Sequence, residues 1–198
     1  MLPIERGEVL GLADYETVRS RFRARVIEEK RSRRVLVGDR VSALFENRDT
    51  VLLQIQEMLR TERITREAGV QHEIATYNQL VPGPGALSAT LMIEVPDQAE
   101  RDAFLDDARG IEKHVALVVD GERLPATWDE SRVLPDRASA VLYLKFPLSA
   151  KAALAVRARK AVAELVIDHP AYQARAPLGA ETLLALGGDL EEDVAGKV

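Results

Sequence analysis

Carboxylates and one histidine are the side chains of this chain that could do chemistry. Glu57 lies three residues after Gln54 on a predicted helix, so the two side chains share a helix face. Oxygen ligands combined with an imidazole suit iron or manganese. A metal site of this kind would have to be assembled across the fold, from Glu46, Gln54, Glu57, Glu62, Glu94 and His169.

His169 is the most informative of the three histidines because a proline follows it. Pro170 restricts His169 to extended backbone, which places the imidazole at the end of a strand. Asp168 is adjacent, but consecutive strand residues point to opposite faces, so a carboxylate that orients this imidazole must come from elsewhere. The competing interpretation is that His169 anchors a turn.

Arginine pairing is the competing interpretation of the carboxylates. Of the 27 basic residues 21 are arginine, and a guanidinium binds a carboxylate through two parallel hydrogen bonds. Arg34, Arg60 and Arg63 are candidate partners. We expect structural pairs of this kind to be the commoner fate of these acids.

Several kinds of site are excluded by what the sequence lacks. There is no cysteine, which excludes disulfides, thiol chemistry and an iron–sulfur cluster held by the chain's own thiolates. No HExxH, GxGxxG or GxSxG pattern occurs, so zinc-protease, dinucleotide and serine-hydrolase motifs are absent. Trp128 lies in an irregular, charged stretch and is interpreted as a surface or interface aromatic.

The segment from residue 19 to residue 34 is strongly basic although the chain carries a net charge of −5. A solvated arginine face, paired with acids of the same or another chain, is the simplest explanation, and it leaves a homo-oligomer open. Nucleic acid is an unfavoured partner because no aromatic residues interleave for base stacking. The candidate partner surface consists of Arg19, Arg23, Lys30, Arg31, Arg33 and Arg34.

The elements expected to position these residues alternate between helices and hairpins. We predict helices over residues 13–31, 50–68, 69–79, 97–109 and 149–160, with Thr50 as an N-cap and Gly69 as a helix stop. Strands are predicted over residues 34–37, 41–45, 86–95, 114–120, 122–127, 139–148 and 161–168, and a short helix near 181–186.

Hairpins grouped with helices favour an α+β fold with a largely antiparallel sheet and several packed helices. No repeat or linker divides the chain, so residues 1–198 are expected to form one domain. Residues 187–198 are rich in acids and are expected to be a frayed tail.

No segment resembles a targeting signal or a membrane span. The first ten residues contain charges, and no stretch reaches the ~18 apolar residues that a span needs. We expect a cytoplasmic protein with no membrane partner.

Several segments together resemble an uncharacterised bacterial protein family, a domain of unknown function of about this length. The resemblance covers nearly the whole chain, and residues 54–64 are its most specific part. The segments are Phe22-Arg23, Lys30-Arg31, Arg33-Arg34, residues 45–47, residues 54–64, Tyr77-Asn78, Ile93-Glu94, Gly110-Ile111-Glu112 and residues 166–172.

Genes of that family are commonly found beside rubrerythrin-like proteins and a cysteine-rich iron–sulfur oxidoreductase. The resemblance therefore implies, by association, a part in peroxide or redox metabolism with these proteins as partners. It carries over no catalytic residues. The leading hypothesis is a cofactor-free accessory or interaction protein, and the alternative is a metal-binding protein or enzyme with a carboxylate–histidine site for iron or manganese.

Overall fold

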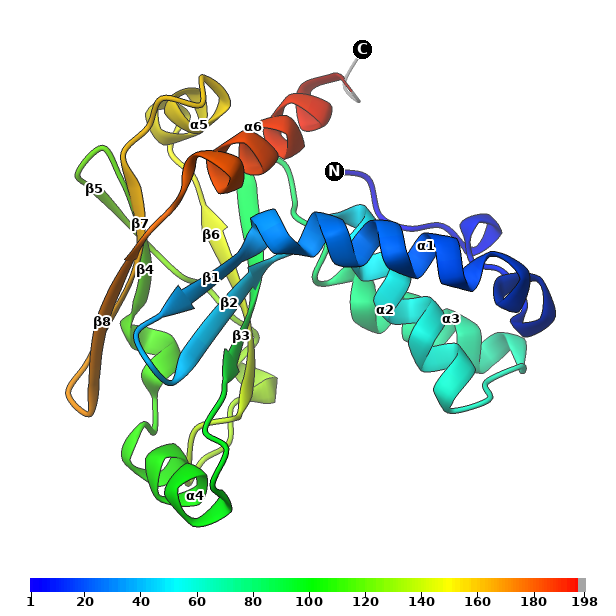
Figure 1. Ribbon diagram of the computed structural model, residues 1–198, viewed down its shortest axis with the longest axis horizontal. Helices are drawn as coiled ribbons and strands as arrows, with labels where there is room; N and C mark the ends of the chain where they lie inside the picture. Colours follow the sequence, from blue (N-terminus) through cyan, green and yellow to red (C-terminus); the bar gives the residue numbers. More distant parts are fainter. Residues whose placement is uncertain (196–198) are drawn as a thin grey trace.

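Two antiparallel four-stranded sheets form the centre of the molecule, seen in the computed structural model of Figure 1. The structure describes the backbone of residues 1–195 and the side chains of residues 1–191. The first sheet has the order β1 (Arg34–Val37), β2 (Val41–Phe45), β3 (Ala86–Ile93), β6 (Val141–Pro147). The second has the order β5 (Glu122–Pro125), β4 (Val115–Val119), β7 (Ala163–His169), β8 (Tyr172–Pro177). This arrangement confirms the predicted α+β fold with antiparallel hairpins.

The main core lies between the two sheets. Alternate residues of β6 are buried, because successive side chains of a strand point to opposite faces. Leu142, Leu144 and Phe146 belong to the same apolar cluster as Leu117 of β4 and Leu165 of β7. Strand β3 is buried on both faces over most of its length. On the outer side of this sheet, Leu36 of β1 and Val141 of β6 remain exposed.

The two sheets are joined at both edges. At one edge Thr127, just after β5, exchanges backbone hydrogen bonds of 2.7 and 2.8 Å with Lys145 of β6. At the other edge the Tyr172 hydroxyl donates to the carbonyl of Val37 at 2.6 Å. Gly38 makes this contact possible: its φ is +74°, and a Cβ there would lie 2.3 Å from the Tyr172 hydroxyl oxygen.

Three helices near the N-terminus form a lobe beside the sheets (Figure 1): α1 (Leu12–Arg33), α2 (Arg48–Thr61) and α3 (Glu67–Asn78). The lobe has an apolar cluster of its own, in which Ile55 and Leu59 of α2 pack with Val70 and Ile74 of α3. Gln56 of α2 is also buried, and its side-chain amide bonds the backbone N–H and carbonyl of Leu10. The N-terminal segment is thereby fixed to the lobe.

The remaining helices flank the sheets. They are α4 (Gln98–Asp107), α5 (Ala150–Arg157), α6 (Ala180–Ala195) and three short 3₁₀ helices, η1 (Arg6–Glu8), η2 (Ile111–His114) and η3 (Glu130–Arg132). Helix α6 contacts both α5 and α1, so the C-terminal part of the chain ties the helical lobe to the sheets. Among the described residues, no helix is both long and apolar enough to cross a membrane.

Some predicted boundaries were wrong. Asn47 caps α2 by accepting from the Thr50 N–H, and Thr50 is its third residue rather than its cap. Gly69 lies inside α3, whereas α2 ends at Thr61 and the chain reverses through Arg63 at φ 52°. Strand β8 was missed entirely.

The largest difference between prediction and structure concerns the frayed tail expected over residues 187–198. Helix α6 continues through Ala195, and Asp189 and Leu190 are buried, so residues 187–190 are part of the packed structure. An acidic residue looked solvent-exposed in the sequence because its partner, Arg33, lies 156 residues away. Residues 196–198 of the predicted tail lie outside the described part of the chain.

Candidate functional site

Glu57 of the predicted metal site forms a polar cluster with helix α1. Its carboxylate accepts two hydrogen bonds of 2.8 Å from Arg19 and one of 2.6 Å from the Tyr15 hydroxyl. The hydrogen bonds from Arg19 and Tyr15 outweigh burial and lower the pKa of Glu57 to about 2. Burial and the same carboxylate raise the pKa of Tyr15 above its ordinary value. This arrangement is the arginine pairing that the sequence suggested, with Arg19 as the partner.

Glu46 is buried at the end of β2 and bonds hydroxyl groups. Thr90 of β3 donates to one carboxylate oxygen at 2.6 Å, and Thr50 of α2 donates to the other. Glu46 and Gln54 line the same cavity of about 270 Å³, together with Lys30 and other residues. The structure thus brings two of the six candidates to one cavity, beside a cation rather than beside further acids.

Glu94 and Glu62 do not line this cavity. Glu94 is half exposed and contacts Arg34 at 3.3 Å and the Ser42 hydroxyl at 3.0 Å. Glu62 is exposed at the C-terminal end of α2. Of the six candidate residues, only Glu46 and Gln54 are thus brought to a common cavity.

His169 is a buried residue at the end of β7. Its Nδ1 accepts the Ala171 N–H at 3.2 Å, which leaves Nε2 to donate to the Arg109 carbonyl at 3.1 Å. This geometry supports the turn-anchoring interpretation. Asp168 points away, as the strand geometry required, and pairs with Arg123 at 2.6 Å. The His114 ring packs edge-on against His169, with centroids 4.9 Å apart.

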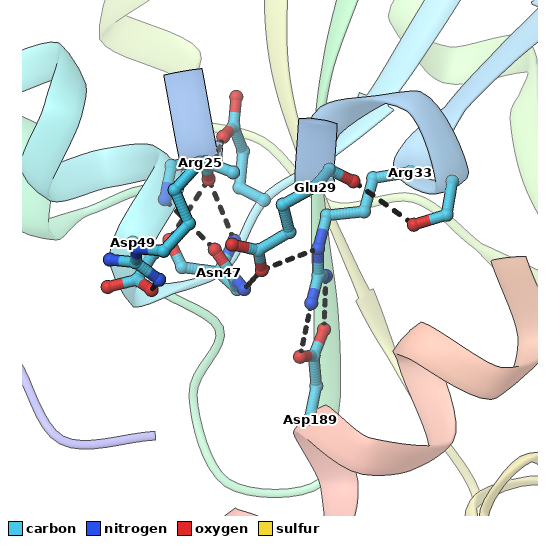
Figure 2. Close-up of polar contacts among 9 residues, drawn as sticks. Arg25, Glu29, Arg33, Asn47, Asp49 and Asp189 are labelled. Atoms are coloured by element: carbon cyan, nitrogen blue, oxygen red, sulfur yellow. Dashed lines mark hydrogen bonds and ion pairs between the residues drawn. The ribbon is translucent and has the colours of Figure 1, made fainter. Parts of the chain in front are cut away.

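The best-buried ion pair of the described chain joins α1 to α6 (Figure 2). Arg33 donates from both terminal nitrogens to Asp189, at 2.6 and 2.8 Å, and from Nε to Glu29 at 3.1 Å. Asn47, the cap of α2, donates its side-chain amide to the same Glu29 oxygen. One buried guanidinium therefore connects three helices, and each of its carboxylate partners belongs to this chain.

The residues of the predicted partner surface fall into two groups, those that form ion pairs and those that do not. Arg19, Arg33 and Arg34 are engaged in the pairs above, and Arg31 pairs on the surface with Glu28 at 2.6 Å. Within the described residues, Arg23 and Lys30 form no ion pair. Nor does Arg21, which lies on the same helix and is exposed.

A pair of cavities beside β6 was not foreseen from the sequence. Each has a volume of about 280 Å³, and both are lined by Trp128, Asp129, Arg132, Tyr143 and Leu144. One of them reaches Glu112 of η2, which is 2% exposed. Burial raises the pKa of Tyr143, and Arg132 lies over its ring at 5.3 Å from the centroid. Two observations from the sequence fall on this site: the single tryptophan in an irregular stretch and the Gly110-Ile111-Glu112 segment, neither of which had predicted a cavity.

A family model described as a protein of unknown function, DUF3501, matches residues 3–190. The chain belongs to the DUF3501 family. Its structure is similar to the crystal structure of a novel protein of unknown function from Burkholderia pseudomallei K96243, with a TM-score of 0.89 and 36% sequence identity. That likeness covers 96% of this chain and 100% of the other. Comparison with curated proteins gives no match.

The candidate metal ligands of this DUF3501 protein do not meet at one point of the structure. Across the described side chains, no group of three or more histidines and acids is placed to hold a metal ion. The predicted carboxylate–histidine assembly is therefore not formed, because Glu57 faces Arg19 whereas His169 faces the Arg109 carbonyl. The polar residues of this DUF3501 chain instead form separate clusters, most of them closed by arginine.

Proposed function

We propose that this DUF3501 protein is an accessory protein that binds an acidic protein partner through the exposed face of helix α1. The observation that supports this proposal best is the contrast between two sets of arginines on one helix. Arg19 and Arg33 point inward and are paired, whereas Arg21 and Arg23 are exposed and have no ion pair in the described chain.

The exposed face of α1 also offers apolar contact area. Ile27 is 38% exposed and lies four residues after Arg23, so the two side chains are neighbours on the helix surface. An apolar side chain beside an unpaired cation suits an acidic partner, since complementary charge speeds encounter and apolar contact stabilises the complex. Arg21 adds positive charge on another side of the helix. Helix α1 spans 22 residues along the outside of the lobe (Figure 1).

The partner class follows from the resemblance to a family found beside rubrerythrin-like proteins and a cysteine-rich iron–sulfur oxidoreductase. We propose one of these redox proteins as the occupant of the α1 face, in a peroxide or redox-stress system. A chain without cysteines suits a protein that assists such partners better than one that carries electrons itself.

Purified components test this proposal. The full chain is mixed with the rubrerythrin-like protein and, separately, with the iron–sulfur oxidoreductase of its own organism, and binding is measured by calorimetry at low and high salt. We expect one of them to bind, with an affinity that falls as salt rises. Replacing Arg21 and Arg23 together by serine should weaken binding at least tenfold.

The control removes the same charge elsewhere. Lys151 and Lys160 are exposed on or beside α5, and their double serine variant should bind as the parent does. Binding to neither redox protein contradicts the partner assignment. Binding that the Arg21 and Arg23 replacements leave unchanged contradicts the surface, and self-association blocked by these replacements would make a second copy the occupant instead.

The iron or manganese alternative is the weaker candidate because its residues lie in different clusters. Elemental analysis of protein purified without chelator tests it. Our proposal predicts less than one tenth of a metal ion per chain and no shift of the melting temperature on adding Fe²⁺ or Mn²⁺. A stoichiometric metal would favour the alternative.

A further inference from the structure

Two buried polar atoms at one cavity have no hydrogen-bond partner. They are Oε1 of Glu112 and Nε1 of Trp128, and both residues line the same cavity of about 280 Å³ beside the edge strand β6. Across the described side chains, these are the only buried side-chain nitrogen or oxygen atoms left unbonded. Because native proteins rarely leave such atoms unpaired, a shared cavity between the two calls for an explanation.

Local structure holds Glu112 in this position. Gly110 adopts φ +81° at the start of η2, and the next residue, Ile111, is fully buried in the core. This anchoring carries Glu112 into the interior, where it is only 2% exposed. Trp128 is positioned from the other side, since Thr127 before it is fixed by the backbone exchange with Lys145.

Two other buried carboxylates of the described chain, unlike Glu112, accept hydrogen bonds from neighbouring side chains. Glu46 accepts from two threonine hydroxyls, and Asp189 accepts two hydrogen bonds from Arg33. Arg132 also lines the cavity, but it contacts Asp129, Gln79 and the Tyr143 ring instead of Glu112. The donor that Glu112 needs is therefore not supplied by the described part of the chain.

The rest of the lining is suited to a small organic molecule. Val133, Val141 and Leu142 give the cavity apolar walls, and Ser139 and Tyr143 add hydroxyl groups. A carboxylate oxygen accepts hydrogen bonds, an indole N–H donates one, and aromatic faces attract cations. A ligand that satisfies all of these combines a cationic donor, an oxygen acceptor and an apolar body.

We propose that this cavity is a binding site for a small organic cation, an amine or a guanidine that also carries an oxygen acceptor. The cationic group donates to Glu112, the oxygen accepts from Trp128, and the apolar body lies along Val141 and Leu142. This site is separate from the α1 face, so it does not depend on the proposed protein partner.

A matched series of four probes tests the assignment: 5-amino-1-pentanol, pentylamine, 1-pentanol and pentanoate. Their affinities for the full chain are measured by calorimetry. Trp128 is the only tryptophan, so its fluorescence reports directly on the cavity. We expect the amino alcohol to bind most tightly, pentylamine next and pentanol at least tenfold more weakly, with no binding of pentanoate.

Substitutions assign each half of the ligand. Glu112→Gln should weaken both amines at least tenfold and leave pentanol unchanged, because a hydrogen bond to a charged group is lost. Trp128→Phe should abolish the preference for the amino alcohol over pentylamine. Glu130→Gln, an exposed acid on the neighbouring η3, is the matched control and should bind all four probes as the parent does.

Three results would overturn the proposal. The first is the absence of saturable binding of either amine, with unchanged Trp128 fluorescence. The second is equal affinity of the parent protein for pentylamine and pentanol, which needs no variant and so holds even if Glu112→Gln fails to fold. The third is a folded Glu112→Gln variant that binds the amines as the parent does.

Discussion

Two polar clusters of this molecule differ in whether they are complete. At the junction of α1 and α6, buried Arg33 has both of its carboxylate partners within the chain, Asp189 and Glu29. Beside β6, buried Glu112 and partly buried Trp128 each have a buried polar atom without a partner. A complete cluster holds the fold, whereas an incomplete one is arranged for a partner from outside.

Removing a side chain is expected to have opposite effects on the free energy of unfolding in the two clusters. Removing one member of a buried, bonded ion pair leaves an uncompensated charge and costs about 3–5 kcal/mol. A buried polar atom with no partner already costs about 1–3 kcal/mol in the folded protein. A buried carboxylate is therefore costly to remove where its charged partner would be left behind, and costly to keep where it has no partner.

The largest effect is expected at the complete cluster. Asp189→Asn leaves the Arg33 guanidinium without its bidentate partner. We expect the free energy of unfolding to fall by about 3 kcal/mol. This is the lower end of the range for a broken buried ion pair, because Glu29 still contacts Arg33. Urea denaturation at pH 7 measures this loss.

Its matched control is Glu191→Gln on the same helix. Glu191 pairs with Arg159 at 2.9 Å but both side chains are well exposed, so the expected change is below about 1 kcal/mol. Equal effects of the two substitutions would show that the buried pair is no more important than a surface one, and would break the comparison.

A smaller, pH-dependent effect is expected at Glu57. Because Glu57 has a pKa of about 2 in the folded chain and near 4.5 in the unfolded chain, ionisation favours folding. Its contribution is present above about pH 4.5 and is lost as the pH falls towards 2. Glu57→Gln should cost about 1–2 kcal/mol at pH 7 and flatten this part of the stability profile.

Glu62→Gln serves as the control for that profile. Glu62 is exposed at the end of the same helix, so its variant should follow the parent curve. A Glu57→Gln variant that loses stability in parallel with the parent between pH 4.5 and 2 would contradict the role given to Arg19 and Tyr15.

The smallest effect on stability is expected on the outer face of α1. Replacing Arg21 and Arg23 by serine removes no contact that holds the fold, so the free energy of unfolding should change by less than about 0.5 kcal/mol. Urea denaturation of the double variant checks this. A loss as large as that of Asp189→Asn would mean that the face is structural and not free for a partner.

The sequence predicted what depends on local pattern. The β1–β2 hairpin around Gly38 was placed correctly, because alternation and turn residues lie within a few positions of each other. Arginine pairing of Glu57 and Glu94 was anticipated from composition, although the partners of individual acids were not all identified. Local chemistry therefore gave the elements and the kind of interaction.

What depends on distant contacts could not be predicted. The pairing of Asp189 with Arg33 needs α6 to pack against α1, and β8 needs β7 as a neighbour before its short alternation is significant. Glu112 belongs to a segment that resembles the family, but its missing partner could not be predicted, because it becomes visible only when every surrounding side chain has been placed.

The effect of Glu112 on stability tests the distinction between complete and incomplete clusters most directly. Glu112→Met keeps the length of the side chain and removes both carboxylate oxygens, and urea denaturation at pH 7 without ligand compares it with the parent. We predict that the variant is equally stable or gains about 1 kcal/mol, since an unpaired buried group is removed. A loss of more than about 2 kcal/mol would mean that Glu112 holds the fold, as Asp189 does, and would contradict the account.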